Sequence, residues 1–359
     1  MKILYDHQIF ASQTYGGVSR YFAEVILRLP ASAWEVTATL SNNHYARHYG
    51  IVRCREFLPQ VDFRHKGRLM AELGKPYSAF RLRRGDYDIY HPTNFDTFGL
   101  RAAGRRPVIV TYHDTNFLTP HNYNRRMARL QHASLKRADK IIAVSENTRQ
   151  DLLSHFDLRP ETIEVIHHGV SRLPAEAFAA IEPPQRPYIL FVGLRHAFKN
   201  FTTFARAFSQ IAPRYPDLRV ICTRTPFSQE ERMLFRKLGI EQRMEVVVAD
   251  EATLARLYTD AEMFVFPSKY EGFGMPILEA MAYGCPCLLA EASCFPEIAD
   301  KAALYFPPDD SEALAAEMER LLCSADLRNL LTTLGLQRVK RFTWERCAEE
   351  HLKLYKSML

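Results

Sequence analysis

The chain has 359 residues, of which 47% are hydrophobic and 25% charged, with 15 Gly and 20 Pro. This composition is typical of a soluble globular protein and excludes disordered, collagen-like and coiled-coil chains, and the length indicates two domains. The apolar runs are too short for a transmembrane helix or a signal peptide. The seven Cys lack the spacing of a disulfide framework or zinc site, which predicts a reducing, cytoplasmic environment.

Positive charge is concentrated in one part of the chain. The formal net charge is +6, and residues 53–106 alone carry twelve Lys or Arg against six Asp or Glu. A second basic run follows at 125–140. Each Lys or Arg beside an anionic lipid surface contributes roughly 1 kcal/mol, so we expect peripheral contact with an anionic membrane surface. The alternative is a solvated basic face. Nucleic-acid binding is not expected, because no DNA- or RNA-binding motif accompanies the charge.

The first half of the chain alternates short apolar runs with amphipathic segments. A strand is expected at Lys2–Tyr5, a turn at Gly16 and Gly17, and a helix over Val18–Leu29 that ends before Pro30. Further strands are expected at Trp34–Leu40, Ile89–His91, Val108–Tyr112, Lys140–Val144 and Glu164–His167, with helices at Asn122–Arg137 and Glu146–His155. This alternation predicts a parallel, doubly wound sheet.

The second half repeats the pattern after a proline-rich segment. Residues 171–187 contain four Pro and are expected to form a stiff linker. The following strands are expected at Tyr188–Val192, Leu218–Cys222, Met244–Val248, Met263–Pro267, Pro286–Leu289 and Ala303–Phe306. We therefore expect an α/β fold of two similar domains, 1–170 and 188–343, with ligands bound where the carboxyl ends of the strands line a cleft. The last helix, 344–359, could pack on either domain.

The most informative stretch runs from Phe266 to Pro286 and is expected to form a strand, a loop, a helix, a helix-ending turn and the start of another strand. Gly272 and Gly274 allow unusual backbone angles and close approach of a ligand, and Pro276 suits a first helical turn. A helix that begins at a glycine-rich loop offers free N–H groups and a positive dipole end, which suits a diphosphate. Glu271 and Glu279 flank that position, where a carboxylate can accept hydrogen bonds from sugar or ribose hydroxyls.

This stretch resembles the glutamate–seven–glutamate signature of retaining glycosyltransferases of family 4, which have the GT-B fold. Other segments resemble family motifs in the same order along nearly the whole chain: Gly16–Arg20, His91–Thr93, Thr111–Asp114, Val144–Thr148, His168–Val170, Val192–Asn200 and Phe342–Glu345. The resemblance implies two Rossmann-like domains facing a central cleft, with 1–170 binding the acceptor, 171–187 as hinge and 188–343 binding the nucleotide sugar. It also implies that helix 344–359 returns to the first domain.

The resemblance assigns roles residue by residue. Lys199 and Arg195 would bind the donor diphosphate and stabilise the leaving group. Glu271 would contact the donor sugar, Glu279 the ribose hydroxyls, and His113 the transferred sugar. The loop and first helical turn would hold the phosphate, and Gly16 and Gly17 would allow close approach from the first domain. The loop and turn residues are Gly272, Phe273, Gly274, Met275, Pro276 and Ile277. We interpret His91, His167 and His168 as structural and Asp114 as a carboxylate that orders its loop.

Two features bear on the chemistry. No Asp-x-Asp sequence is interpreted as the kind that holds a divalent metal with a nucleotide sugar in other transferase folds, and Asp309-Asp310 is interpreted as a helix cap, so metal-independent transfer without a cofactor is expected. Where family members carry a glycine-rich turn after the strand at 218–222, this chain has Thr223-Arg224-Thr225-Pro226. Arg224 is therefore a candidate phosphate or base contact, and the local donor contacts differ from those of the family.

The sequence predicts a retaining, metal-independent hexosyltransferase that moves a hexose or deoxyhexose to a lipid-linked or cell-surface glycan, as in O-antigen, lipopolysaccharide, capsule or exopolysaccharide assembly. A general likeness to mannosyl- and rhamnosyltransferases favours a GDP-sugar donor, with mannose as the sugar. The expected location is the inner face of the cytoplasmic membrane. The alternatives are another GT-B sugar-nucleotide enzyme (an epimerase or a phosphorylase), a catalytically silent partner subunit, and a basic membrane or nucleic-acid adaptor.

Overall fold

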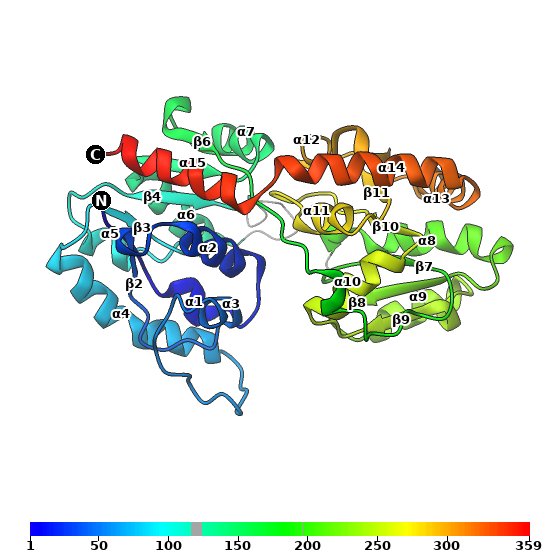
Figure 1. Cartoon of the computed structure of the whole chain (residues 1–359), viewed down its shortest axis with the longest axis horizontal. Helices are drawn as coiled ribbons and strands as arrows, with labels where there is room; N and C mark the ends of the chain where they lie inside the picture. Colours follow the sequence, from blue (N-terminus) through cyan, green and yellow to red (C-terminus); the bar gives the residue numbers. More distant parts are fainter. Residues whose placement is uncertain (116–123, 196) are drawn as a thin grey trace. The chain divides into compact units, whose positions relative to one another are not determined.

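The computed structural model describes residues 1–115, 124–195 and 197–359 and contains two compact units (Figure 1). The first unit comprises Met1–Gly169 and Trp344–Leu359, and the second comprises Val170–Thr343. The chain therefore leaves the first unit near Gly169 and returns to it with its last helix.

The second unit is built on a six-stranded, all-parallel sheet with the strand order β12-β11-β10-β7-β8-β9. Counted from β7, this is the order 6-5-4-1-2-3 of a Rossmann fold. Strands β7, β10 and β11 are buried on both faces, as expected for a parallel sheet covered by helices. The strands are β7 Tyr188–Phe191, β8 Arg219–Thr223, β9 Met244–Val247, β10 Met263–Phe266, β11 Cys287–Ala290 and β12 Ala303–Phe306. The helices are α8 Phe201–Ile211, α9 Gln229–Lys237, α10 Glu251–Asp260, α11 Met275–Ala282, α12 Phe295–Ala299, α13 Ser311–Cys323 and α14 Ala325–Arg338.

The first unit contains two three-stranded parallel ladders, β2-β1-β3 and β4-β5-β6. A single parallel bridge between Tyr90 and Val108 joins them. The strands are β1 Ile3–Tyr5, β2 Trp34–Val36, β3 Ile89–His91, β4 Ile109–Tyr112, β5 Lys140–Ala143 and β6 Ile163–Val165. The helices are α1 Gln8–Ser12, α2 Gly17–Arg28, α3 His44–His48, α4 Lys66–Arg84, α5 Phe98–Ala102, α6 Arg125–Arg137, α7 Glu146–His155 and α15 Trp344–Ser357.

The predicted α/β class and the two Rossmann-like units are confirmed, with strand bounds mostly within one or two residues of those expected. The main exception is β2, which ends at Val36 rather than Leu40. After Val36 the chain leaves the strand, and the hydroxyl of Ser41 donates to the carbonyl of Phe10 and accepts from the amide of Asn43. The predicted start of the helix at Asn122 lies outside the described residues, and α6 is described from Arg125.

The proline-rich segment 171–187 belongs to the second unit by its contacts. The amide of Leu173 donates to the hydroxyl of Tyr283 at 2.9 Å, and Phe178 is buried with its ring against that of Tyr283. Pro174 leads into a short 3-10 turn at Ala175–Ala177. The segment is thus tied to the unit that follows it in the sequence.

Helix α15 is held in the first unit by a buried polar network. The hydroxyl of Tyr355 lies 2.8 Å from the hydroxyl of Tyr5 and 2.8 Å from Nδ1 of His91. One turn earlier, Nε2 of His351 lies 2.6 Å from the hydroxyl of Tyr21. Thr111 connects the two branches, because its hydroxyl contacts both His91 and Tyr21. The network links β1, β3, β4 and α2 to the end of the chain.

Within the part of the chain that the structure describes, every helix is too short or too polar to cross a bilayer.

Candidate functional site

The predicted donor residues of the second unit follow its two central strands. Strands β7 and β10 are neighbours, and the strand order reverses between them. Ligands of open α/β sheets bind at the carboxyl ends of the strands at such a reversal. The loop after β7 carries Lys199, and the loop after β10 carries Glu271. The backbone amide of Lys269 donates to the carbonyl of Phe198 at 2.8 Å and ties the two loops together.

Lys199 and Glu271 form an ion pair between their Nζ and Oε1 atoms. Their side chains are only 16% and 17% exposed, so the pair is shielded from bulk solvent but still accessible. The ammonium group also lies 5.3 Å from the ring centres of Phe198 and Phe266. The aromatic rings and the carboxylate hold the cation at the end of the sheet, where a second anion could bind beside it.

The backbone around Glu271 is fixed by the loop that follows β11. The amide of Glu271 donates to the hydroxyl of Ser293 at 3.2 Å, and that hydroxyl donates back to the carbonyl of Glu271 at 2.5 Å. Ser293 has a φ of 54°, a left-handed conformation that is uncommon for serine. This paired contact fixes the position of the Glu271 backbone.

Helix α11 begins directly after this loop. Gly274 is its N-cap with a φ of 79°, and Pro276 lies in the first turn, as the sequence predicted. A methyl group added at Gly274 would lie 3.0 Å from Cδ1 of Ile277, so both backbone angle and space favour glycine here. The first turn of α11 has no side-chain cap, and its N–H groups therefore suit an anion.

Glu279 lies one turn into α11, on the side facing α10. Its Oε2 accepts a hydrogen bond from the hydroxyl of Tyr258 at 3.3 Å. Burial, followed by the Glu279 charge, holds the pKa of Tyr258 well above its usual value, so the phenol stays protonated and remains a donor. This contact orients the carboxylate while the side chain stays partly exposed.

The structure does not bring Arg195 together with Lys199 and Glu271. Its Nε donates to Glu231 at 2.5 Å, and its Nη2 donates to the carbonyls of Thr225 and Pro226 at 2.7 and 2.9 Å. The side chain is 4% exposed, with the guanidinium carbon 4.8 Å from the ring centre of Phe227. Arg195 thus joins the β7 loop to the turn after β8 and to α9.

Arg224 occupies the turn after β8 with a φ of 82°. This left-handed conformation is the one that a glycine would take without strain. The preceding residue, Thr223, is buried, and its hydroxyl accepts a hydrogen bond from the amide of Gly193 at 3.2 Å. The exposed Arg224 side chain therefore emerges beside the β7 loop, at the same end of the sheet as Lys199.

In the first unit, Gly16 and Gly17 form the start of α2. A methyl group at Gly16 would lie 2.2 Å from the side chain of Gln13, whereas one at Gly17 would meet nothing within 4 Å. Gln13 in turn accepts from the amide of Ser19 at 3.2 Å. A side chain at Gly16 would therefore require the Gln13 side chain to move. The open space beside Gly17 is compatible with close approach of a ligand.

His113 follows β4, with its ring against those of Tyr21, Phe22 and His168. Its Nε2 atom is buried and has no hydrogen-bond partner among the described residues. Burial lowers the pKa of His113 from 6.5 to about 3, so the imidazole is neutral near pH 7. A neutral ring with one unpaired nitrogen can donate or accept one hydrogen bond from a ligand.

The structure describes no metal-binding cluster of three His, Cys, Asp or Glu in residues 1–115, 124–195 and 197–359. Asp310 caps α13 by accepting from the amides of Glu312 and Ala313, as predicted, and Asp309 pairs with Lys269. His196, which lies in the resemblance to the phosphate-binding loop, is outside the described residues.

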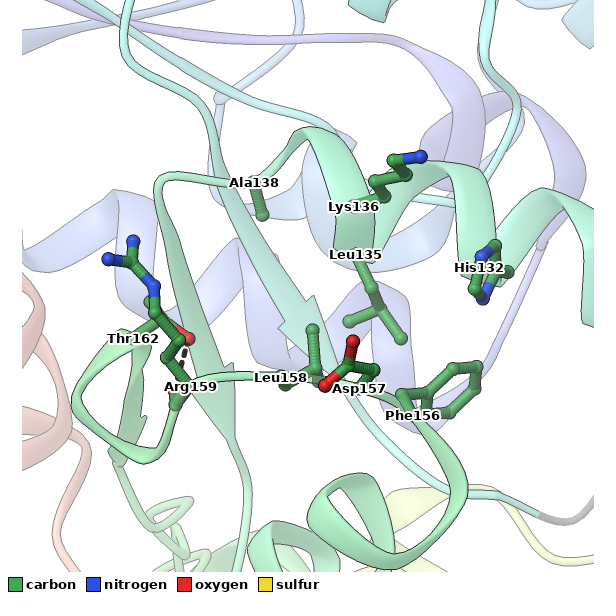
Figure 2. Close-up of a pocket in the computed structure, with 9 residues that line it drawn as sticks. All are labelled: His132, Leu135, Lys136, Ala138, Phe156, Asp157, Leu158, Arg159 and Thr162. Atoms are coloured by element: carbon green, nitrogen blue, oxygen red, sulfur yellow. Dashed lines mark hydrogen bonds between the residues drawn. The ribbon is translucent and has the colours of Figure 1, made fainter.

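A cavity of about 300 Å³ lies elsewhere in the first unit (Figure 2). It is formed by the end of α6 and the segment between α7 and β6, at the amino ends of β5 and β6. None of the predicted site residues lines it. The lining residues are His132, Leu135, Lys136, Ala138, Phe156, Asp157, Leu158, Arg159 and Thr162.

Sequence reasoning missed residues that position the predicted ones. Ser293 fixes the Glu271 backbone, Tyr258 holds Glu279, and Glu231 holds Arg195. Glu231 carried a local signal, because it forms a capping box with Ser228 at the start of α9. Ser293 and Tyr258 had no such signal, since each contacts its partner across more than twenty residues of sequence.

Comparison with known proteins identifies the family. Residues 186–324 match the model described as glycosyl transferases group 1, and residues 15–172 match the model described as Glycosyltransferase Family 4. The chain is a family 4 glycosyltransferase. The two models cover the two units in turn, and the glutamate–seven–glutamate stretch from Glu271 to Glu279 lies within residues 186–324.

Relatives of this glycosyltransferase include bacterial mannosyltransferases. O-antigen chain mannosyltransferase B of Escherichia coli is 29% identical over 95% of this chain and 96% of its own length. An MMP alpha-(1->4)-mannosyltransferase of Mycolicibacterium hassiacum is 25% identical over 77% of this chain and 72% of its own. Among solved structures, Anabaena HepE in complex with UDP and glucose has a TM-score of 0.79 at 18% identity, with 99% of this chain and 100% of that chain covered. This structural likeness confirms the GT-B fold.

Proposed function

We propose that this glycosyltransferase moves a mannose-type hexose, with retention of configuration, from a GDP-sugar to a hydroxyl of a lipid-linked or cell-surface glycan. The names of the sequence relatives support the sugar: three of them are O-antigen or serotype-specific mannosyltransferases. The acceptor class follows from the same names, because O-antigen chains are cell-surface glycans. UDP- and dTDP-sugars are the donors against which this proposal is tested.

The observation that carries the proposal is the Lys199–Glu271 pair at the strand reversal of the second unit, directly before the first turn of α11. A nucleotide sugar has an anionic diphosphate next to a sugar rich in hydroxyls. The cation and the helix N-terminus suit the diphosphate, and the carboxylate suits the hydroxyls. Glu271 contacts the Lys199 ammonium, and a bound diphosphate would share that cation with it.

The proposed reaction breaks the bond between the anomeric carbon and the diphosphate oxygen. The acceptor hydroxyl forms the new bond on the same face, and its proton passes to the departing diphosphate. Lys199 and the α11 N-terminus stabilise the negative charge that develops on the leaving group, without a metal ion. Glu271 orients the sugar. No covalent glycosyl-enzyme forms, and Glu271 is not a nucleophile.

Arg195 is proposed to act as a positioning residue. Its contacts with Glu231, Thr225 and Pro226 occupy most of the guanidinium, and its Nη1 is buried without a partner among the described residues. These contacts hold the β7 loop that carries Lys199. We therefore expect Arg195 to affect donor binding indirectly, by fixing the position of that loop.

The remaining residues are proposed to bind substrate. Glu279 accepts from the ribose hydroxyls, and the loop and first turn of α11 bind the phosphate through backbone N–H groups. From the first unit, Gly17 allows close approach of a ligand at the start of α2. His113 forms a hydrogen bond with the transferred sugar through its unpaired Nε2. The enzyme is proposed to work at the inner face of the cytoplasmic membrane, where lipid-linked acceptors are held.

The test is a thermal-shift panel of GDP, UDP and dTDP with their mannose, glucose and rhamnose conjugates. A ligand at about 100 times its dissociation constant stabilises the folded protein by about 2.7 kcal/mol. We expect the largest shift with GDP-mannose, and NMR of the product should show the donor's anomeric configuration. A clear preference for UDP or dTDP would overturn the donor assignment. An inverted product, or an adduct trapped on Glu271, would overturn the proposed reaction.

A further inference from the structure

Exposed hydrophobic side chains gather in one part of the first unit. Seven of the sixteen large hydrophobic side chains that are exposed in the described chain lie between residues 58 and 80: Leu58, Val61, Phe63, Leu69, Leu73, Tyr77 and Phe80. Four of them are on α4, and the other three lie in the loop before it. Single exposed apolar residues are ordinary, but a contiguous group indicates a binding surface.

The four residues on α4 share one face of the helix. Leu69, Leu73, Tyr77 and Phe80 follow the spacing i, i+4, i+8 and i+11, and they are 41%, 51%, 42% and 59% exposed. At 1.5 Å per residue this stripe extends about 17 Å along the helix axis. We call these four residues the outer face of α4. It is an apolar strip whose side chains are about half exposed.

The inner face of α4 combines two large apolar residues, Met70 and Leu82, with Gly74 and Ser78. Gly74 packs so closely on His7 that an added methyl would lie 2.3 Å from the imidazole ring. Ser78 lies 2.6 Å from Nδ1 of His7 and 2.6 Å from the hydroxyl of Thr37. A helix that packs only on its own domain normally turns its large apolar residues inward. Most of the large apolar residues of α4 are on its outer side, so the fold of this unit does not require them.

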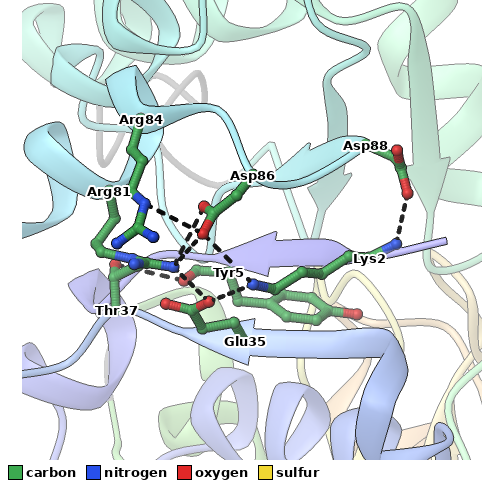
Figure 3. Close-up of polar contacts among 8 residues, drawn as sticks. All are labelled: Lys2, Tyr5, Glu35, Thr37, Arg81, Arg84, Asp86 and Asp88. Atoms are coloured by element: carbon green, nitrogen blue, oxygen red, sulfur yellow. Dashed lines mark hydrogen bonds and ion pairs between the residues drawn. The ribbon is translucent and has the colours of Figure 1, made fainter.

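The far end of α4 is anchored by ion pairs (Figure 3). Arg81 donates to Glu35 at 2.7 Å and pairs with Asp86 at 3.2 Å, while Lys2 pairs with the same Glu35 at 2.8 Å. These contacts tie the end of α4 to β2 and to the segment after the helix, and Arg81 lies one turn beyond Tyr77 of the outer face. Leu69, Leu73 and Phe80 take no part in these ion pairs, so substitutions at these three positions leave the pairs in place.

The surface around the outer face is strongly basic. Residues 58–84 contain seven Lys or Arg against two Asp or Glu. Arg64, Arg68 and Arg83 are exposed in this same segment. An apolar helix face of Leu, Tyr and Phe in a segment rich in exposed Arg is typical of a helix that lies in a membrane interface. The excess of positive charge matches anionic lipid, which is why we favour lipid over a protein partner.

We propose that α4 and the loop before it dock this glycosyltransferase on an anionic lipid surface, with the outer face buried among the acyl chains and the arginines at the headgroups. The inference deepens the membrane location proposed above by adding insertion of apolar side chains to charge attraction. It does not depend on the donor, because vesicle binding is measured without sugar nucleotide. Failure of one proposal is therefore distinguishable from failure of the other.

The test is co-sedimentation of the full chain with vesicles of phosphatidylglycerol and phosphatidylethanolamine, compared with phosphatidylcholine alone. The wild type should bind the anionic vesicles. The triple variant Leu69→Gln, Leu73→Gln and Phe80→Gln should bind at least about tenfold more weakly. The matched control changes exposed apolar residues of the second unit, Met233→Gln, Val248→Gln and Leu330→Gln, and should bind like the wild type.

A second set of variants separates charge from insertion. Arg64→Gln, Arg68→Gln and Arg83→Gln together should weaken binding at least about tenfold, and the control set Arg206→Gln, Arg232→Gln and Arg341→Gln much less. A Leu73→Trp variant should shift its fluorescence to the blue on anionic vesicles, and Met233→Trp should not. The shift should persist at about 1 M salt, where the Debye length is about 3 Å.

Three outcomes would overturn the inference. One is a wild type that does not bind anionic vesicles. Another is binding that the outer-face variant leaves unchanged. The third is a dimer in sedimentation velocity that the outer-face variant converts to a monomer, because the outer face would then bind a second copy of the chain. Circular dichroism and thermal unfolding of each variant confirm that it is folded before binding is compared.

Discussion

The two units have related folds, but they place their polar groups differently. In the second unit the strands are apolar and buried, and Lys199 and Glu271 are at the carboxyl end of the sheet, partly exposed. In the first unit a polar network runs through the interior, from His91 and Thr111 to Tyr355. The comparison shows that the second unit has a partly exposed charged pair at the end of its sheet, whereas the first uses buried polar groups to hold the last helix.

The largest effect expected from this difference is acid sensitivity of the first unit. Burial lowers the pKa of His113 to about 3 and that of His351 to about 4, and holds the pKa values of His91 and His168 well below 6.5. Below pH 6.5 the unfolded chain binds protons that the folded unit does not, so the free energy of unfolding falls as pH falls. The loss is up to about 1.4 kcal/mol per pH unit for each histidine.

Tryptophan fluorescence can follow this loss in the first unit alone, since both Trp residues, Trp34 and Trp344, belong to it. Urea midpoints measured between about pH 7.5 and about pH 5.5 should fall steeply. The exposed control variant His155→Gln should show the same slope as the wild type. A midpoint independent of pH would contradict the neutral state of the four histidines.

The next largest effect should come from cutting the network at α15. Tyr355→Phe removes a hydroxyl that contacts both Tyr5 and His91 and leaves two buried polar groups without that partner. The free energy of unfolding should fall by about 2 kcal/mol. Tyr215→Phe, whose hydroxyl contacts the exposed Cys323, is the control and should change little. Equal stability of the two variants would show that the network does not hold the helix.

A smaller effect, on activity rather than stability, is expected at Gly17. Gly17→Ala adds a methyl group where nothing lies within 4 Å, so the free energy of unfolding should stay within about 1 kcal/mol of the wild type. If a ligand approaches this position, kcat/KM should fall about tenfold to a hundredfold. An unchanged kcat/KM would remove Gly17 from the proposed site.

The smallest effect is expected at Arg224 in the second unit, where we compare the free energy of unfolding with the KM for the donor. Arg224→Gly relieves the left-handed backbone and should raise the free energy of unfolding by about 0.5–1 kcal/mol. Arg224→Ala keeps the strain but removes the guanidinium. If Arg224 contacts the donor, both variants should raise the KM for the donor while only the glycine variant gains stability. A donor KM unchanged in both variants would leave Arg224 without a binding role.

Sequence patterns predicted the strands of both units, because buried parallel strands form short apolar runs. They also predicted the position of α11, because Gly272 and Gly274 mark the loop directly before the helix. They did not identify α4. Its inner face is Met70, Gly74, Ser78 and Leu82, so the helical spacing is carried partly by small and polar residues. The basic charge of the region was visible in the sequence, but the exposed apolar face required the coordinates.

Sequence analysis assigned Lys199 and Glu271, which lie in two separate motifs, to one site. In the structure the two side chains form an ion pair. The different placement of Arg195 could not be predicted. Its partner Glu231 is 36 residues away, and only the fold decides that the guanidinium points toward α9. The neutral state of His113 likewise depends on burial by rings from two separate segments, α2 and the segment that contains His168.

The central claim is that Lys199, acting with the α11 N-terminus and without a metal ion, binds the donor diphosphate and supports transfer. The most direct test measures transfer from GDP-mannose in the presence of EDTA for the wild type, Lys199→Ala and the exposed control Lys237→Ala. We predict full activity for the wild type and the control, and a loss of about a hundredfold or more for Lys199→Ala. Transfer that EDTA abolishes, or that Lys199→Ala leaves intact, would contradict the account.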